Sequence, residues 1–188
     1  MKAAIALLAD HKTQNVVRRM VYDLNRQYGI GFLASLLPAH VSLKQPFAFE
    51  RMEILEGYLD ALAASITPFE IELDRVYHFR SGDIGILGLN VVETSVLRDL
   101  HNRIHCELEA LFEDVSAPHD GESYHFHLTI ELGKVEGEDV FRRYYDEMET
   151  RQIDLRFTAR EIALFYYDEP KAGAYMTYKV LGLGNSHE

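Results

Sequence analysis

Two short stretches of the chain place a hydroxyl residue two positions after a histidine. The first begins at His40 and reads HVSL, and the second begins at His127 and reads HLTI. An imidazole titrates near neutral pH and can take or give a proton, and a hydroxyl can donate a hydrogen bond to a phosphoryl oxygen. Two such pairs around one phosphate would supply an acid, a base and two donors. This chemistry is suited to the in-line cleavage of a phosphodiester.

Both stretches lie in predicted β segments. Side chains alternate between the two faces of a strand, so each histidine should share a face with its hydroxyl residue, and the apolar pair should face the core. At average composition, one such stretch should occur by chance in roughly one chain in ten of this length. Two copies at matching places in an internal repeat are a stronger indication of a shared site.

The elements that position the motifs alternate between apolar strands and amphipathic helices, which indicates a mixed α and β fold. The first half predicts a strand, a helix, the β segment of the first motif, a second helix and two further strands. These elements span residues 2–9, 13–28, 39–43, 51–65, 69–79 and 84–92. Gly29 and Gly31 provide a stop for the first helix, and the turn at 81–83 joins the last two strands.

The second half repeats this order. It predicts a helix, the β segment of the second motif, another helix and two strands, at residues 95–112, 126–132, 138–150, 155–167 and 175–183. The next helix begins eleven positions after the histidine in both halves, at Arg51 and at Glu138. Such self-similarity predicts a single α+β domain over 1–188, with pseudo-two-fold related lobes of approximately 1–92 and 93–188.

Charge restricts the class of partner. The chain has 30 acidic and 19 basic residues and a formal net charge of −11, which repels polyanions. Long duplex nucleic acid is therefore an unsuitable partner. A small phosphate ester or an RNA end stays compatible, because a few donors in a cleft can outweigh the average field.

The apolar segments and the single cysteine indicate where the protein resides. The chain contains no run of about eighteen apolar residues, and the apolar stretch 3–9 fits a buried strand. Cys106 is the sole cysteine, cannot form an intramolecular disulfide, and is predicted to be buried in its helix. We therefore expect a cytoplasmic protein that does not bind membranes, with the monomer as the expected state.

The paired motifs, 87 residues apart, resemble those of the two-histidine (2H) phosphoesterase superfamily, which includes 2',5'-RNA ligase-like proteins and cyclic nucleotide phosphodiesterases. The segment HVSLKQPF, from His40 to Phe47, is similar to the first motif of many members. The resemblance implies a bilobal α+β fold with a central cleft, and catalysis by His40 and His127 without metal or other cofactor. It also implies phosphate binding by Ser42 and Thr129. After Thr129 this chain reads IELG, where the 2',5'-RNA ligase-like branch often has a basic residue shortly after the second motif.

Three more residues are candidate substrate contacts. Lys44 lies either exposed on its strand or against a phosphate, and Phe47 and Tyr124, near the motifs, either pack in the core or stack on a base. The expected reaction is hydrolysis of a small cyclic phosphodiester, such as a 2',3'-cyclic nucleotide or an RNA end. Either histidine could be the acid.

Two other classes of function stay open. A nucleotide or RNA-end binding module could keep the same pocket without turnover. Alternatively, His125 and His127 could form a metal site with Glu131 or another carboxylate, or with the helical pair His101 and His105. The helical pair is predicted to lie on a solvated face.

Overall fold

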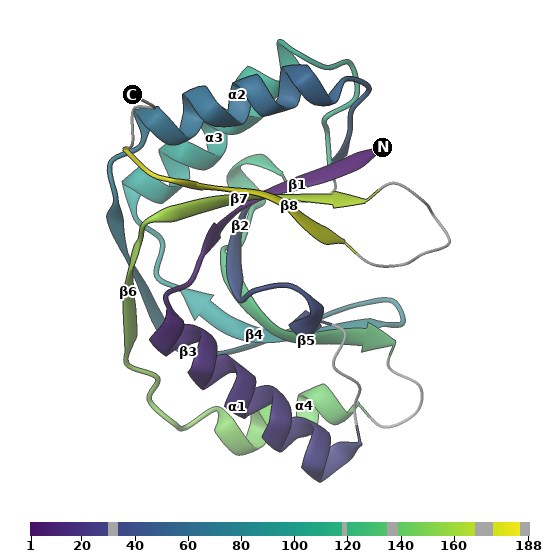
Figure 1. The fold of residues 1–188 in the computed structure, drawn as a ribbon. Helices are drawn as coiled ribbons and strands as arrows, with labels where there is room; N and C mark the ends of the chain where they lie inside the picture. The colour runs from purple at the N-terminus through teal and green to yellow at the C-terminus, as the bar shows by residue number, and fades with distance from the viewer. Residues whose placement is uncertain (30–33, 118–119, 135–138, 168–174, 185–188) are drawn as a thin grey trace.

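The computed structural model describes residues 1–29, 34–117, 120–134, 139–167 and 175–184 of the chain. Within these ranges, four α-helices and eight strands form the predicted α+β fold (Figure 1). In chain order these are β1 (Lys2–Leu8), α1 (His11–Tyr28), β2 (His40–Ala48), α2 (Met52–Ser65), β3 (Phe69–Ser81), β4 (Ile84–Val91), α3 (Ser95–Glu109), β5 (His127–Lys134), α4 (Val140–Met148), β6 (Leu155–Ala159), β7 (Glu161–Tyr167) and β8 (Met176–Gly182).

All eight strands belong to one sheet in the order β6-β3-β4-β5-β2-β1-β7-β8, and every pair of neighbours is antiparallel. The sheet interleaves the two halves of the sequence. The half of the sheet that ends at β5 contains β6, β3, β4 and β5, and the half that begins at β2 contains β2, β1, β7 and β8. The strands that carry the two motifs are therefore direct neighbours.

The segment 155–167, predicted as one strand, is two strands separated at Arg160. β6 pairs with β3 at one edge of the sheet, whereas β7 pairs with β1 beyond the central pair. The single-strand prediction is wrong because a change of hydrogen-bonding partner leaves no mark on the pattern of apolar and polar side chains. The helix predicted at 138–150 begins at Val140 in the structure, and its expected first residue, Glu138, lies outside the described residues.

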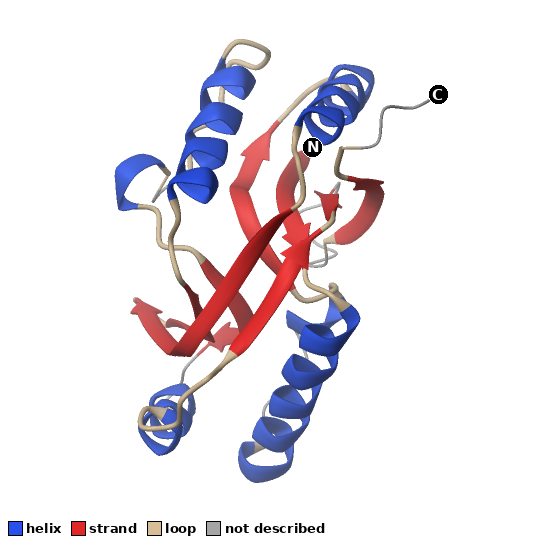
Figure 2. Ribbon diagram, turned by 90° about the vertical axis from the view of Figure 1, so that its left-hand side faces the viewer, coloured by secondary structure: helices blue, strands red, loops and turns tan. Residues whose placement is uncertain are grey.

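Two pairs of helices pack on the sheet at opposite ends of the molecule (Figures 1 and 2). α3 packs on β2, and α2 packs on β7 and β8. At the other end, α1 packs on β5 and β6, while α4 packs on β3 and β4. None of the described helices combines the length and the apolar character that crossing a membrane requires.

Helix α1 shows how local sequence sets the bounds of an element. Its N-cap Asp10 accepts a hydrogen bond from the backbone N–H of Thr13 at 2.7 Å, which satisfies one of the free donors of the first turn. Its end at Gly29 has φ of 66°, a left-handed conformation that glycine adopts without steric cost. Between these caps, Val17, Val21 and other residues at helical spacing face the core.

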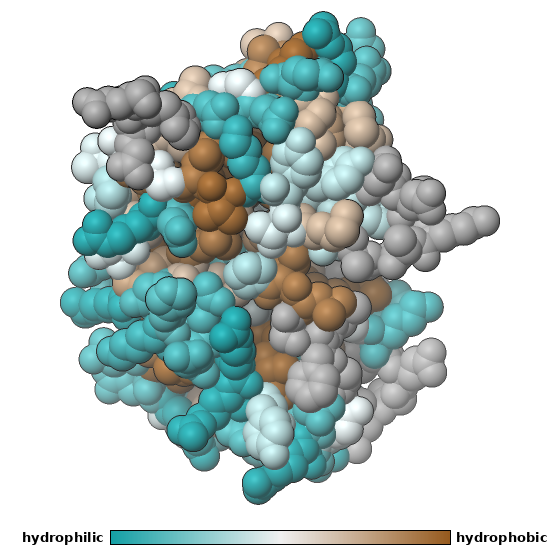
Figure 3. All heavy atoms as spheres, in the orientation of Figure 1, coloured by the Kyte–Doolittle hydropathy of each residue, from teal (hydrophilic) through white to brown (hydrophobic). Residues whose placement is uncertain are grey.

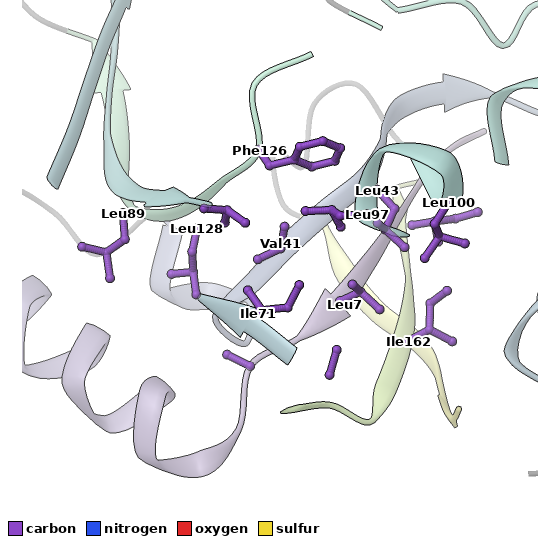
Figure 4. Packing of buried hydrophobic residues seen from close by; sticks show 14 of the residues in the cluster. Leu7, Val41, Leu43, Ile71, Leu89, Leu97, Leu100, Phe126, Leu128 and Ile162 are labelled. Atoms are coloured by element: carbon purple, nitrogen blue, oxygen red, sulfur yellow. The ribbon is translucent and has the colours of Figure 1, made fainter. Parts of the chain in front are cut away.

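The main core lies between the helices and the sheet (Figure 4). Val41 and Leu128, the second residues of the two motifs, are fully buried in it together with Leu89 and Phe126. On the opposite face of the sheet, alternate residues of β1 and β7 form a smaller buried apolar cluster, made by Ala4, Ala6, Leu8, Ala163 and Phe165. The polar residues of the two motifs lie on this face.

Cys106 is exposed, which corrects the prediction that it is buried. The buried stripe of α3 runs through Leu100, Ile104 and Leu108. Two residues beyond Ile104 correspond to a rotation of about 200° around a helix, so Cys106 points away from the stripe.

Candidate active site

The four motif side chains with polar groups lie around one pocket of about 510 Å³. His40 and Ser42 come from β2, and His127 and Thr129 come from β5. All four are partly exposed, in contrast to the buried apolar residues that alternate with them. The alternation expected for a strand therefore brings both histidines and both hydroxyls to one cavity.

The register of the two strands fixes their mutual placement. Val41 pairs with Leu128 across the antiparallel β2–β5 ladder. One step to either side of this pair, the histidine of each motif lies opposite the hydroxyl residue of the other motif. A phosphate above the pair would therefore meet a histidine and a hydroxyl from each strand.

Both histidines are held in the same way. The Nδ1 atom of His40 lies 2.8 Å from the carbonyl oxygen of Pro38, and the Nδ1 atom of His127 lies 3.0 Å from the carbonyl oxygen of His125. A carbonyl can only accept, so Nδ1 carries the hydrogen in each ring. The Nε2 atom of each ring is left as a base when the ring is neutral and as an acid when it is protonated.

Burial sets the charge state of the pair. It lowers the pKa of His40 below its usual value, and the nearby His127 lowers it further, although the bond to the Pro38 carbonyl partly opposes this. The pKa of His127 is likewise lowered by burial and then by His125, against the bond to its carbonyl. Near neutral pH both rings are therefore mostly neutral, and a proton on one disfavours a proton on the other.

The surroundings of the two rings differ. The ring of Phe165 meets His40 edge-on with centroids 4.7 Å apart, whereas Tyr77 stacks on His127 with centroids 5.5 Å apart. Neither aromatic residue is singled out by the sequence pattern. Both come from strands outside the two motif strands, so only the sheet order brings them to the histidines.

The rest of the pocket wall is mainly apolar, and none of its described residues is Lys or Arg. Apolar residues are also exposed in the middle of the face in Figure 3, between the two pairs of helices. The larger apolar side chains of the wall include those of Leu36, Leu37, Pro38, Pro46, Phe79, Ile86, Leu132, Phe165 and Tyr175.

Lys44 is neither exposed on its strand nor part of the pocket wall, so both alternatives predicted for it are wrong. Its side chain is fully buried and forms an ion pair with Asp120. The β1–β2 register shifts on both sides of the pair that Lys44 makes with Ile5. Such bulges break the alternation that begins at His40, so Lys44 leaves the face of the site.

The two candidate aromatics have different places. Phe47 is buried in the core beside Phe49 and Phe112, with centroids 6.4 and 6.3 Å away, and does not reach the pocket. Tyr124 does line the pocket, and its hydroxyl donates to the carbonyl oxygen of Ser42 at 3.0 Å. Tyr124 thus also supports the backbone of the first motif.

His101 is buried and is not on the solvated face predicted for it. Its Nδ1 lies 2.8 Å from the carbonyl oxygen of Leu43, and its Nε2 accepts from the N–H of Gly121 at 3.1 Å. It therefore links the strand of the first motif to the segment that leads into the second. The signal for burial is present in the sequence, since position 101 falls on the apolar stripe between Leu97 and Ile104.

The histidines and carboxylates of the alternative metal site do not lie close together. Within the described residues, no group of three or more His, Cys, Asp or Glu side chains lies close enough to hold a metal ion. The ring of His125 instead stacks on Tyr77 with centroids 4.4 Å apart. Glu131 accepts hydrogen bonds from the N–H groups of Ala34 and Leu132.

Solved structures of other proteins have a similar fold. The chain is similar to the crystal structure of TT0787 of Thermus thermophilus, with a TM-score of 0.67, 15% identity and 100% of both chains covered. It is also similar to E. coli LigT complexed with 3'-AMP, with a TM-score of 0.58 and 17% identity over 97% of this chain and 96% of that one. At such identities these likenesses show the fold alone.

A comparison with curated protein sequences gives no match. The family model of the 2'-5' RNA ligase superfamily, however, matches residues 12–171, which is most of the chain. The chain therefore belongs to the 2'-5' RNA ligase superfamily of two-histidine phosphoesterases.

Proposed function

We propose that this chain is a metal-independent phosphodiesterase that hydrolyses a small cyclic phosphodiester, either a 2',3'-cyclic nucleotide or an RNA end with a cyclic phosphate. The observation that carries the proposal is the pair of identically held imidazoles, His40 and His127, in one pocket with two hydroxyl residues. The structure of E. coli LigT complexed with 3'-AMP supports a nucleotide as the kind of ligand.

In this mechanism the two imidazoles act in concert. The neutral ring takes a proton from water through Nε2, and the water oxygen bonds to phosphorus while the bond to the leaving ribose oxygen breaks. The protonated ring donates its Nε2 proton to that ribose oxygen, which yields a phosphomonoester. Ser42 and Thr129 donate to the non-bridging oxygens and stabilise the charge that grows there. The roles of His40 and His127 can be exchanged in this scheme.

The same proposal includes the division of the domain. The sheet segments on the two sides of the β2–β5 pair would act as two lobes, with the pocket between them. Because the strands interleave, each lobe would contain strands from both halves of the sequence. The pseudo-symmetry of the motifs would then follow from the position of β2 and β5 at the junction.

Activity should not depend on a divalent metal. The purified protein, incubated with 2',3'-cyclic AMP and excess chelator, is expected to form a single phosphomonoester at the same rate as without chelator, because side chains supply the protons and donors. Product formation is followed by chromatography. Loss of activity with chelator and its return with zinc would contradict the proposal. Tight binding of the cyclic nucleotide without any product would favour the binding module.

The pH dependence should reflect the lowered pKa values. Catalysis needs one proton shared by the pair, so kcat/KM should give a bell whose optimum lies below about pH 6.5, the ordinary value for histidine. Raising the pH above the upper apparent pKa removes the shared proton, so kcat/KM should fall about tenfold per pH unit across the neutral range. Measuring kcat/KM between about pH 4.5 and 8.5 tests this. An optimum on the alkaline side of neutrality would contradict it.

A further inference from the structure

Three aromatic rings are stacked at the side of the pocket. Tyr77 lies against His125 with centroids 4.4 Å apart and an interplanar angle of 26°, and against His127 with centroids 5.5 Å apart and an angle of 28°. The rings of His125 and His127 are 6.4 Å apart and within 17° of parallel. We name Tyr77 and His125 the aromatic shelf. It extends from the catalytic His127 but does not belong to the described wall of the pocket.

The sheet builds this shelf through a glycine. Gly88 of β4 pairs with Tyr77 of β3 on one side and with Thr129 of β5 on the other. With no side chain at Gly88, the ring of Tyr77 can extend over β4 and contact the ring of His127, at the start of β5, and the ring of His125 just before it. A Cβ at this position would lie 2.8 Å from the carbonyl oxygen of Leu128, so β4 and β5 also approach too closely here for a larger residue.

The shelf presents an uncharged ring to solvent. His125 is exposed, although one of its faces is covered by Tyr77. Partial burial of the ring and the nearby Arg75 lower the pKa of His125, against the carboxylates of Glu93 and Asp74, so the ring is mostly neutral near neutral pH. Such a fixed, planar and neutral surface is suited to stacking on a nucleobase, and little side-chain freedom is lost when the base binds.

The charges around the shelf do not favour a second phosphate. Arg75 is paired with Asp74 at 2.9 Å, and Arg98 is paired with Glu93 at 2.6 Å. The formal charge of the whole chain is −11. A ring that stacks on His125 is therefore a better fit than a further stretch of phosphate backbone.

We propose that the aromatic shelf is a second binding site, which stacks the base of the nucleotide next to the reactive phosphate. The preferred substrate would then be a short oligonucleotide that ends in a cyclic phosphate, rather than a cyclic mononucleotide. This inference rests on the proposed function, since it takes the phosphate between His40 and His127 as its reference point. His127 lies between that phosphate and the shelf, so the adjacent nucleotide would leave the pocket on this side.

The test compares kcat/KM for a dinucleotide ending in a 2',3'-cyclic phosphate with kcat/KM for the matching 2',3'-cyclic mononucleotide. The wild-type protein is expected to prefer the dinucleotide roughly 10-fold, mainly through a lower KM, which is the size of effect that one stacked base gives. His125→Ala should reduce this ratio to about one. Tyr77→Phe keeps the ring and should keep the ratio, as should His11→Ala, which removes an exposed histidine at the start of α1.

Two outcomes would contradict the proposal that the aromatic shelf binds a base. One is a wild-type ratio near one, and the other is a His125→Ala variant that slows both substrates equally, which would mean that the ring only positions His127. Equilibrium binding distinguishes failure of this inference from failure of the proposed catalytic function. A 3'-phosphorylated dinucleotide and the matching mononucleotide are titrated into the same variants, and the shelf predicts the same preference and its loss in His125→Ala, whether or not the protein turns over.

Discussion

Replacement of either His40 or His127 by alanine is expected to lower kcat/KM for a 2',3'-cyclic nucleotide by roughly 10²- to 10⁴-fold, the range for loss of one general acid or base. In each ring Nδ1 lies 2.8 or 3.0 Å from a carbonyl oxygen, so in the proposed mechanism only Nε2 would act on the substrate. No neighbouring group in the mechanism can replace it. The measurement is steady-state kinetics at several pH values, with circular dichroism to show that each variant is folded.

Three comparisons give this experiment its controls. The double variant His40→Ala/His127→Ala should lose far less than the product of the two single losses, since the two residues act as a unit. Ser42→Ala and Thr129→Ala remove one donor each but no proton-transfer group, so they should cost less and should also raise KM. A folded single-histidine variant with full activity would disprove the paired acid and base.

The replacement Lys44→Met is expected to lower the free energy of unfolding by about 3–5 kcal/mol, the cost of breaking a buried ion pair from one side. The side chain of Lys44 is 0% exposed and that of Asp120 is 6% exposed. Methionine fills a similar volume but leaves the Asp120 carboxylate without its cation in a region of low dielectric. Equilibrium unfolding in urea measures the change.

The matched controls separate burial from charge. Lys134→Met removes the lysine of the pair with Asp83, whose side chains are 70% and 69% exposed, and should cost less than about 1 kcal/mol. The double variant Lys44→Met/Asp120→Asn should recover part of the loss, because it removes the unpaired buried charge. The amide oxygen can still accept from the N–H of Ala117, as Asp120 does at 2.9 Å. If Lys44→Met cost no more than Lys134→Met, the buried pair would contribute little to stability.

The sequence predicts the part of the site that obeys simple alternation. From His40 to Leu43 and from His127 to Ile130, polar and apolar residues alternate without a break, and the structure places the polar ones around one pocket. For Lys44, the residue directly after Leu43, the prediction is wrong. A bulge changes the face of a residue but needs no special side chain, so the pattern of residue types cannot show it.

The rest of the site depends on contacts between distant elements. The stacking of Tyr77 on His127 requires two strand pairings and a glycine between them, and the link from His101 to Leu43 requires α3 to pack on β2. Neither contact has a local signature. The helices and their caps, by contrast, follow from residues a few positions apart, and the sequence predicts their bounds to within a few residues.

The interleaved order of the strands has a consequence for synthesis on the ribosome. The buried strand β1 leaves the exit tunnel first, but its second neighbour, β7, is made only at residues 161–167. Until then one edge of β1, with its row of unpaired N–H and C=O groups, is open to pairing with other chains. Contacts of such long sequence separation also form slowly. A nascent chain that stalls before β7 should therefore be a client for chaperones, with both histidine motifs already synthesised.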